Sequence, residues 1–157
     1  MSLTTDYRPQ NWSHVIGQDS VVEVLKNSIV NKQLANAYLF VGIRGTGKTT
    51  CARLLAKSLD CKQLAEDGEP CGQCESCVAI TKGNSLDVKE IDMATNRGID
   101  DVRAIQESVQ YAATGGRYRI VICDEAHQMT PQAASALLKV LEEPPKNVKF
   151  ILCTTEL

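Results

Sequence analysis

The chain has 157 residues, a length that favours one domain with a full hydrophobic core. Hydrophobic residues make up 43% and charged residues 23%, as in water-soluble globular proteins, and the net charge of −2 excludes an overall basic field that would attract nucleic acid. No apolar run reaches the length of a membrane span and the N-terminus lacks the layout of a signal peptide, so we expect no membrane partner and a cytoplasmic location.

The segment before the first helix is expected to form an arm. Pro9 restricts Arg8 to an extended conformation, and Trp12 with the run at 15–17 makes a short apolar patch followed by a turn. Two interpretations stay open: the arm packs on the core, or it folds over the base of a bound nucleotide. Ser20 is the expected N-cap of a helix that reaches about residue 32.

A phosphate-binding loop follows a short apolar strand. Residues 38–49 read YLFVGIRGTGKT, in which the strand leads into G-x-x-x-x-G-K-T, and a helical pattern continues from Thr50 through Leu59. The glycines let successive backbone N–H groups point at an anion, and the start of the helix adds its partial positive charge. Lys48 is expected to reach the outer phosphates and Thr49 to bind Mg²⁺ through its hydroxyl. From these residues alone, the ligand is ATP or GTP.

Four of the seven cysteines are spaced as metal ligands. Cys61 is followed, after nine residues, by the C-x2-C-x2-C run of Cys71, Cys74 and Cys77. Four thiolates can close around a tetrahedral Zn²⁺, and a closed shell predicts a structural ion without a catalytic role. Disulfides, which a reducing compartment disfavours, and an iron–sulfur cluster are the alternatives. The remaining cysteines lie in apolar patterns and are expected to be buried core thiols: Cys51, Cys123 and Cys153.

The rest of the chain alternates strands and helices. Strands are expected at 86–92, 118–123 and 148–153, and helices at 75–82, from Asp100 or Asp101 onward, and from Thr130 to the proline pair at 144–145. The last helix is expected to bury one apolar face, made of Ala134, Leu137, Leu138 and Leu141. This alternation predicts an α/β fold whose mostly parallel sheet is covered by helices on both faces.

The strand at 118–123 delivers an acidic pair, Asp124 and Glu125. An apolar strand that ends in two acids is what the second half of a phosphate-loop ATPase requires: Asp124 would join the Mg²⁺ shell, and Glu125 would orient or deprotonate the attacking water. Such a pair alone is often only the start of a helix, but the phosphate loop upstream favours the hydrolytic interpretation. His127 lies beside the acids, and a surface or packing role explains it at least as well as a functional one.

Together these features closely resemble the N-terminal ATPase domain of the bacterial DNA polymerase III gamma/tau family, the motor of the sliding-clamp loader. The resemblance begins at about residue 6. It is carried by YRP at 7–9, VIGQ at 15–18, the phosphate loop at 42–49, the four cysteines, DEAH at 124–127 and ALLKVLEEPP at 136–145. A sister subunit, delta-prime, has a similar cysteine module with a degraded phosphate loop, so the intact GKT here favours gamma/tau.

The resemblance implies a three-layer AAA+ P-loop NTPase core with a parallel sheet. Its expected parts are the adenine arm, phosphate loop and first helices (6–60), a small four-cysteine zinc-module insert (61–83), and the rest of the sheet with the Walker B acids and a sensor (84–157). The implied ligands are ATP or ADP, Mg²⁺ and Zn²⁺.

The family pattern also assigns roles to residues of this sequence. Those expected to bind nucleotide are Tyr7, Arg8, Pro9, Val15, Ile16, Gly17, Arg44, Gly45, Thr46, Gly47, Lys48, Thr49 and Thr50. Thr155, just past the last strand, matches the polar sensor that touches the γ-phosphate. The expected catalytic set is therefore Lys48, Asp124, Glu125 and Thr155.

The partners implied are other gamma/tau, delta and delta-prime subunits, the sliding clamp and, in the full assembly, primed DNA. Family members continue past the position of Leu157 into a fifth strand, an arginine finger, a lid and a collar, so we expect a C-terminally truncated core whose strand at 38–41 is an open edge. Because a neighbour's arginine finger contributes about 10³–10⁵ in rate, these residues alone are expected to hydrolyse ATP weakly or not at all.

Two other functions compete with a clamp-loader motor. One is a zinc-stabilised, nucleotide-binding assembly subunit that does not hydrolyse ATP, as in delta-prime. The other is a nucleic-acid-remodelling ATPase such as a helicase, which 4% aromatic residues and a net charge of −2 disfavour.

Overall fold

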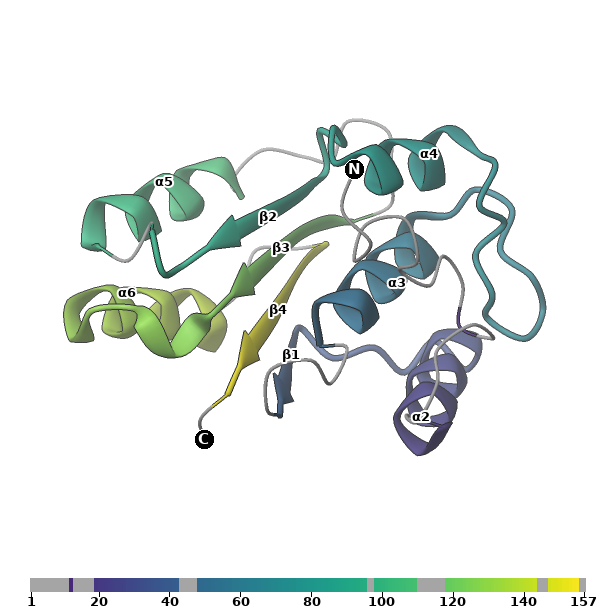
Figure 1. Cartoon of the computed structure of the whole chain (residues 1–157), viewed down its shortest axis with the longest axis horizontal. Coiled ribbons are helices and arrows are strands. Elements are labelled where there is room, and N and C mark those ends of the chain that lie inside the picture. The colour runs from purple at the N-terminus through teal and green to yellow at the C-terminus, as the bar shows by residue number, and fades with distance from the viewer. Residues whose placement is uncertain are drawn as a thin grey trace.

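Four parallel strands form the central sheet. In the computed structural model they are β1 (Ala37–Val41), β2 (Val88–Asp92), β3 (Arg119–Asp124) and β4 (Val148–Thr154), and their spatial order is β1-β4-β3-β2 (Figure 1). The structure describes residue 12 and residues 19–42, 48–95, 98–109, 118–143 and 147–155. All three strand pairings are parallel, so the predicted parallel α/β fold is confirmed.

The helices begin and end at residues with clear local reasons. They are α2 (Asp19–Val30), α3 (Lys48–Asp60), α4 (Glu75–Lys82), α5 (Ile99–Ser108), the short 3₁₀ helix η2 (Ala126–Gln128) and α6 (Pro131–Glu142). At the start of α6 the Thr130 hydroxyl accepts from the Ala133 N–H at 3.2 Å, and Pro131 takes the first helical position, as predicted. Gly83 ends α4 with a left-handed φ of 75°, a conformation that favours glycine. None of the helices in these ranges combines the length and apolarity needed to cross a membrane.

The sheet is the middle layer of three. Successive side chains of a strand point to opposite faces, so Ile120 and Ile122 of β3 pack with α2, α3 and α4, whereas Val121 and Cys123 pack with α5 and α6. Figure 1 shows the two groups of helices on opposite sides of the strands. The expectation of helices on both faces is therefore confirmed.

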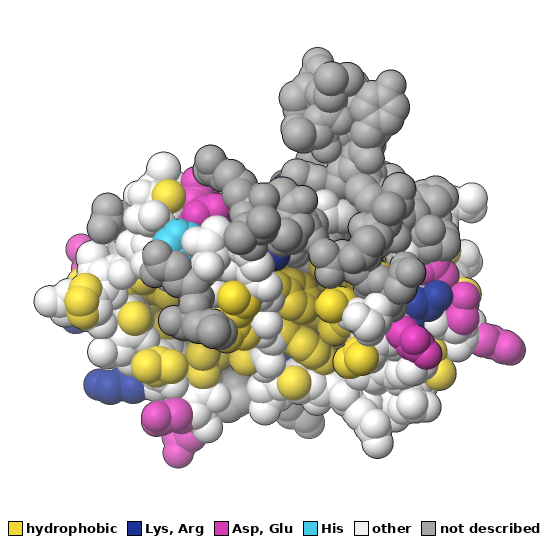
Figure 2. All heavy atoms as spheres, turned by 60° about the horizontal axis from the view of Figure 1, so that its bottom comes forward, with side chains coloured by type: hydrophobic (Ala, Val, Ile, Leu, Met, Phe, Trp, Pro, Cys, Tyr) yellow, Lys and Arg dark blue, Asp and Glu magenta, His cyan; other side chains and the backbone are white. Residues whose placement is uncertain are grey.

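Strand β1 forms one edge of this four-stranded sheet, as expected. Leu39 and Val41 are 56% and 41% exposed, and on the neighbouring helix α2 Val24 is 67% exposed. A cavity of about 630 Å³ runs between α2, β1 and the start of α3. Figure 2 shows apolar side chains gathered in the middle of this face of the molecule. Among the described strands, β1 therefore pairs on one side only, with β4.

Three local expectations were wrong. The first helix begins at Asp19, so Ser20 lies inside it and is not its N-cap. Strand β2 begins at Val88 and not at residue 86, because the Ser85 hydroxyl accepts from two backbone N–H groups, those of Asp87 and Val88, both at 3.2 Å, and holds a turn there. Leu138, expected on the buried face of α6, is 58% exposed, whereas Leu137 is buried as expected and Ala133 is buried as well.

Candidate functional site

The start of α3 positions Lys48 and Thr49 at the ends of β1 and β4. The Gly42 N–H donates to the Thr154 carbonyl oxygen at 3.1 Å, which joins the beginning of the phosphate loop to the end of β4. Lys48 Nζ donates to the Gly42 carbonyl oxygen at 2.6 Å, so the ammonium group lies back over this junction. Thr50 follows in the first turn of α3 and is half-buried. Residues 43–47, including Arg44, Gly45, Thr46 and Gly47, lie outside the described residues.

The two expected magnesium ligands meet across a separation of 75 residues. Thr49 Oγ1 donates to Asp124 Oδ2 at 3.2 Å, from the first turn of α3 to the last residue of β3. A hydroxyl and a carboxylate oxygen at hydrogen-bond distance can both reach one hard cation, which prefers oxygen ligands. The strand order explains the meeting, because parallel strands place their carboxyl ends at one edge of the sheet.

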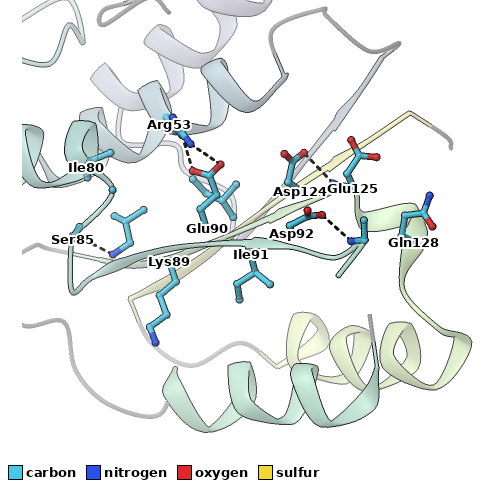
Figure 3. Close-up of a pocket in the computed structure, with 14 residues that line it drawn as sticks. Arg53, Ile80, Ser85, Lys89, Glu90, Ile91, Asp92, Asp124, Glu125 and Gln128 are labelled. Atoms are coloured by element: carbon cyan, nitrogen blue, oxygen red, sulfur yellow. Dashed lines mark hydrogen bonds and ion pairs between the residues drawn. The ribbon is translucent and has the colours of Figure 1, made fainter. Parts of the chain in front are cut away.

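A second carboxylate stands beside Asp124. In the register of β2 and β3, Asp92 pairs with Asp124, and both line a cavity of about 910 Å³ together with Glu90 and Glu125 (Figure 3). Arg53 of α3 reaches Glu90 of β2 with two hydrogen bonds, at 2.7 and 2.9 Å. This fork ties the helix that follows the phosphate loop to the strand beside the acids.

Glu125 has an unusual backbone. Its φ of 55° and ψ of 44° lie in the left-handed region, which residues other than glycine rarely adopt. Its N–H donates to Asp124 Oδ1 at 3.0 Å, and its carbonyl oxygen accepts from the Gln128 N–H at 2.9 Å. The turn gives the two acids different partners, since Asp124 contacts Thr49 and Glu125 contacts His127. Both acids line the cavity (Figure 3).

Thr155, the expected sensor, lies at the end of β4 and is exposed. Its hydroxyl is 3.5 Å from His127 Nε2, and the same ring nitrogen is 3.4 Å from Glu125 Oε2. Cys153, two residues before Thr155, is fully buried. Burial, together with the negative charge of Asp124, raises the pKa of its thiol to about 12. Lys48, Asp124, Glu125 and Thr155 are thus brought to one edge of the sheet.

The arm is represented by Trp12, because Tyr7, Arg8, Pro9, Val15, Ile16 and Gly17 lie outside the described residues. Trp12 is only 1% exposed and belongs to the core cluster of α2 and α3. Its indole N–H donates to the Ser58 hydroxyl of α3 at 2.8 Å. Packing of the arm on the core, one of the two open interpretations, is therefore correct at this residue.

The four spaced cysteines form one cluster. The sulfur atoms of Cys61, Cys71, Cys74 and Cys77 all lie within 4.8 Å of one another. A tetrahedral zinc ion with Zn–S bonds of about 2.3 Å needs sulfurs about 3.8 Å apart, so this donor set fits that ion. All four are free thiols, and so are the other three cysteines, which are buried in the core as predicted.

Backbone N–H groups turn toward these sulfurs. Cys61 Sγ accepts from the Cys71 N–H at 3.3 Å, and Cys71 Sγ accepts from the Cys74 N–H at 3.1 Å. Burial pushes the pKa of Cys74 upward, but donation from the backbone N–H groups of Lys62 and Cys77 and from neighbouring thiols outweighs it and lowers the pKa to about 6. Burial raises the pKa of Cys61 and Cys77. Donors aimed at sulfur favour the thiolate form that a metal requires.

Sequence reasoning missed several members of the site. Asp92 and the pair formed by Arg53 and Glu90 carry no local motif, because β2 becomes the neighbour of β3 only in the folded sheet. His127 lies two residues from Glu125 in the sequence, but its contacts with the end of β4 depend on the pairing of β3 and β4 in the folded sheet.

The chain is similar to subunits of DNA polymerase III. Residues 17–157 match the family model described as "DNA polymerase III, delta subunit". The chain is 45% identical to the tau subunit of Bacillus subtilis (96% of this chain, 26% of that protein), 43% to the tau subunit of Escherichia coli (98% and 24%) and 43% to the gamma subunit of Buchnera aphidicola (99% and 42%). It therefore spans about a quarter to two-fifths of the length of these relatives.

Solved structures agree on the fold. A gamma-subunit-related protein of Thermotoga maritima superposes with a TM-score of 0.54 at 29% identity, over 84% of this chain and 38% of that one. The RuvB Holliday junction branch migration motor of the same organism superposes with a TM-score of 0.59 over 96% of this chain and 42% of that one. At 17% identity the second likeness concerns the fold alone. The AAA+ P-loop fold and the resemblance to gamma/tau subunits are both confirmed.

Proposed function

Because the chain belongs to the DNA polymerase III subunit family, with gamma and tau subunits among its relatives, we propose that it is the ATP-binding motor domain of a clamp loader. The observation that carries this proposal is the 3.2 Å hydrogen bond from Thr49 to Asp124. It joins the residue after the loop lysine to the acid that ends β3, which is the pairing that a phosphate-loop ATPase needs to hold a nucleotide-bound cation.

Each residue of the proposed catalytic set has a distinct task. Thr49 and Asp124 would hold Mg²⁺, which would neutralise charge on the outer phosphates. Lys48 would move its ammonium group from the Gly42 carbonyl oxygen to the phosphates, guided by the start of α3. Glu125 would take the proton of the attacking water, and Thr155 would donate its hydroxyl to the γ-phosphate.

The arm and the loop would complete the nucleotide site. Tyr7, Arg8, Pro9, Val15, Ile16 and Gly17 are proposed to contact adenine, with the phosphates held by the loop residues from Arg44 to Thr50. The buried hydrogen bond of Trp12 to Ser58, near the end of α3, supports an arm that packs on the core. Adenine in preference to guanine follows from the family, as no N/T-K-x-D guanine motif occurs in the sequence.

Zinc is proposed as a structural ion of the cysteine segment. Cys61, Cys71, Cys74 and Cys77 would provide four sulfur ligands and leave no open position, so the ion would stabilise the fold and take no part in hydrolysis. The division into nucleotide-binding parts at 6–60 and 84–157 and a zinc module at 61–83 follows from this proposal.

The names of the full-length relatives suggest the assembly in which this activity would take place. We place the chain beside other gamma/tau, delta and delta-prime subunits, where ATP binding and hydrolysis would load the sliding clamp onto primed DNA during replication. Each site in such an assembly would be completed by an arginine of a neighbouring subunit, which contributes about 10³–10⁵ in rate in related enzymes.

The decisive experiment compares the wild type with Glu125→Gln. We expect both to bind Mg-ATP with dissociation constants within about twofold, because Gln keeps the shape of the side chain, and only the wild type to hydrolyse it in a single-turnover assay with enzyme in excess. Lys48→Ala should bind at least about tenfold more weakly. Failure of the wild type to bind ATP would refute the proposal.

The same assay distinguishes the motor function from the competing one, an assembly subunit that binds nucleotide without hydrolysing it. If the chain binds ATP but shows no hydrolysis that Glu125→Gln removes, even after addition of partner clamp-loader subunits, then nucleotide acts only as a ligand of the fold. A zinc content of one ion per chain is expected in either case, so it does not distinguish the two functions.

A further inference from the structure

The His127 ring lies between Glu125 and the end of β4. Nδ1 is 3.0 Å from the Thr154 hydroxyl and 3.5 Å from the Thr155 backbone nitrogen. Nε2 is 3.4 Å from Glu125 Oε2 and 3.5 Å from the Thr155 hydroxyl. The ring is only 13% exposed, whereas the Glu125 side chain is 30% exposed. One side chain therefore contacts both the acid that follows β3 and the pair of threonines that ends β4.

The contacts favour one tautomer of the neutral ring. The Thr155 backbone N–H can only donate, so Nδ1 accepts there, and the Thr154 hydroxyl can donate to the same nitrogen. The remaining proton is on Nε2, from which it points at the Glu125 carboxylate and the Thr155 hydroxyl. This tautomer gives every contact of the ring a donor and an acceptor.

The backbone explains why such a contact is needed. Glu125 adopts a left-handed conformation, and η2 begins directly after it. Its N–H and carbonyl oxygen are held by Asp124 and Gln128, and among the described residues its carboxylate contacts His127. The backbone conformation therefore sets the direction in which the Glu125 side chain leaves the main chain, and the contact with the imidazole sets the position of its carboxylate.

We propose that His127 is a positioning residue that aligns Glu125 with the sensor end of β4. A displacement of Thr155 by the γ-phosphate would move the ring and, through Nε2, the carboxylate that takes the proton of the attacking water. This inference rests on the proposed function, because it takes Glu125 as the base and Thr155 as the sensor. It adds a residue that the motif alone left as a surface or packing histidine.

Two conservative variants separate the two edges of the ring. In His127→Gln the side-chain amide reaches the position of Nε2 and can still donate to Glu125. In His127→Asn the amide reaches only the position of Nδ1, so the contacts with the Thr154 hydroxyl and the Thr155 N–H are kept, and those with Glu125 and the Thr155 hydroxyl are lost. His127→Ala loses both.

The kinetic prediction distinguishes alignment from a purely structural role. We expect the single-turnover rate of hydrolysis to fall about 10- to 100-fold in His127→Ala and His127→Asn and to stay within about fivefold of the wild type in His127→Gln, because misplacement of a catalytic group by about 1 Å has effects of that size. The dissociation constant of Mg-ATP should change less than about twofold in all three, which also reports that they are folded. Equal losses in Gln and Asn, or no loss in Ala, would overturn the inference.

A second measurement does not depend on hydrolysis. In ¹⁵N-resolved NMR of the imidazole rings, with His127→Asn used to assign the signals, we expect His127 to be the Nε2-protonated tautomer and its Nε2 resonance to shift in both Glu125→Ala and Thr155→Val. Glu107→Ala, on the exposed face of α5, should leave it unchanged. If the wild type does not hydrolyse ATP but these shifts occur, the motor function fails and the alignment stands. If the shifts are absent, the alignment is wrong whatever the rate.

Discussion

The indole N–H of Trp12 donates to the Ser58 hydroxyl at 2.8 Å, and that hydroxyl donates in turn to the Gly68 carbonyl oxygen at 3.2 Å. Trp12 and Ser58 are each 1% exposed. A single buried hydroxyl thus joins the N-terminal arm, the helix after the phosphate loop and the loop between Cys61 and Cys71. These three parts of the molecule depend on one another through it.

Replacing that hydroxyl should destabilise the protein. Ser58→Ala leaves the Trp12 indole N–H and the Gly68 carbonyl oxygen without this partner in a buried place, so we expect the free energy of unfolding to fall by about 1–3 kcal/mol in urea denaturation. Ser108→Ala is the matched control, because it removes only a bond to the Ile105 carbonyl oxygen within α5. Equal effects of the two substitutions would contradict the importance of the shared hydroxyl.

Gly68 should tolerate a methyl group worse than Gly83. Both have a positive φ, 92° and 75°, so alanine is strained at both by about 1–2 kcal/mol. At Gly68 a Cβ would also approach the Lys26 carbonyl oxygen of α2 to 3.3 Å, whereas at Gly83 nothing lies within 4 Å. We therefore expect Gly68→Ala to lower the midpoint of thermal unfolding further than Gly83→Ala does, and the opposite order would show that the loop can move away from α2.

The pairing of Thr49 with Asp124 predicts how magnesium affects binding. Thr49→Val and Asp124→Asn should each weaken ATP binding about 10- to 100-fold when Mg²⁺ is present, as expected for the loss of a contact to a charged group, and little in its absence. Because both act on one ion, the double variant should be less affected than the sum of the two free-energy changes. Calorimetric titration with and without EDTA measures both. Full additivity would mean that the two residues do not share a cation.

Metal removal should expose four thiols and leave three protected. With zinc bound, we expect iodoacetamide at pH 8 to modify none of the seven cysteines rapidly. After chelation Cys74, whose pKa is lowered to about 6, should react first, and Cys61, Cys71 and Cys77 should follow as the segment, no longer held by the ion, opens. Burial raises the pKa of Cys123 and Cys153 to about 12, so only about 10⁻⁴ of each is thiolate at that pH. Mass spectrometry counts the modified sites, and a pattern unaffected by the chelator would refute the metal site.

The free energy of unfolding should also depend on bound zinc. If zinc is supplied at about 1,000 times its dissociation constant, its removal lowers the free energy of unfolding by about 4 kcal/mol. Cys74→Ser should reduce both the zinc content and the response to chelator. Cys51→Ala, at a buried cysteine outside the cluster, should leave one zinc per chain.

Features with local causes were predictable from the sequence. Thr130 with Pro131 and the glycine at position 83 mark helix ends by their own chemistry, and the structure has them as expected. The alternation of strands and helices was sufficient for a parallel sheet. The spacing of four cysteines was sufficient for a cluster, because a short turn-rich segment brings their sulfurs together with little help from the rest of the chain.

Features that depend on distant neighbours were not predictable. The spacing of apolar residues in α6 fits two faces that both contain Leu137, and only packing against α5 and the sheet leaves Leu138 in solvent. The contact of Arg53 with Glu90, and that of His127 with the end of β4, join elements far apart in the sequence. Neither secondary-structure propensities nor sequence motifs specify which strands pair in the folded sheet.

The strand order also has a consequence for synthesis of the chain. Among the described strands β1 pairs with β4, and Phe150, the partner of Ala37, follows it by about 110 residues. At about 5–20 residues per second on the ribosome, β1 would wait roughly 5–20 seconds for that partner. During that time its apolar side chains have only α2 and α3 to pack against, so the nascent chain is most open to chaperones and to wrong pairing just before β4 emerges.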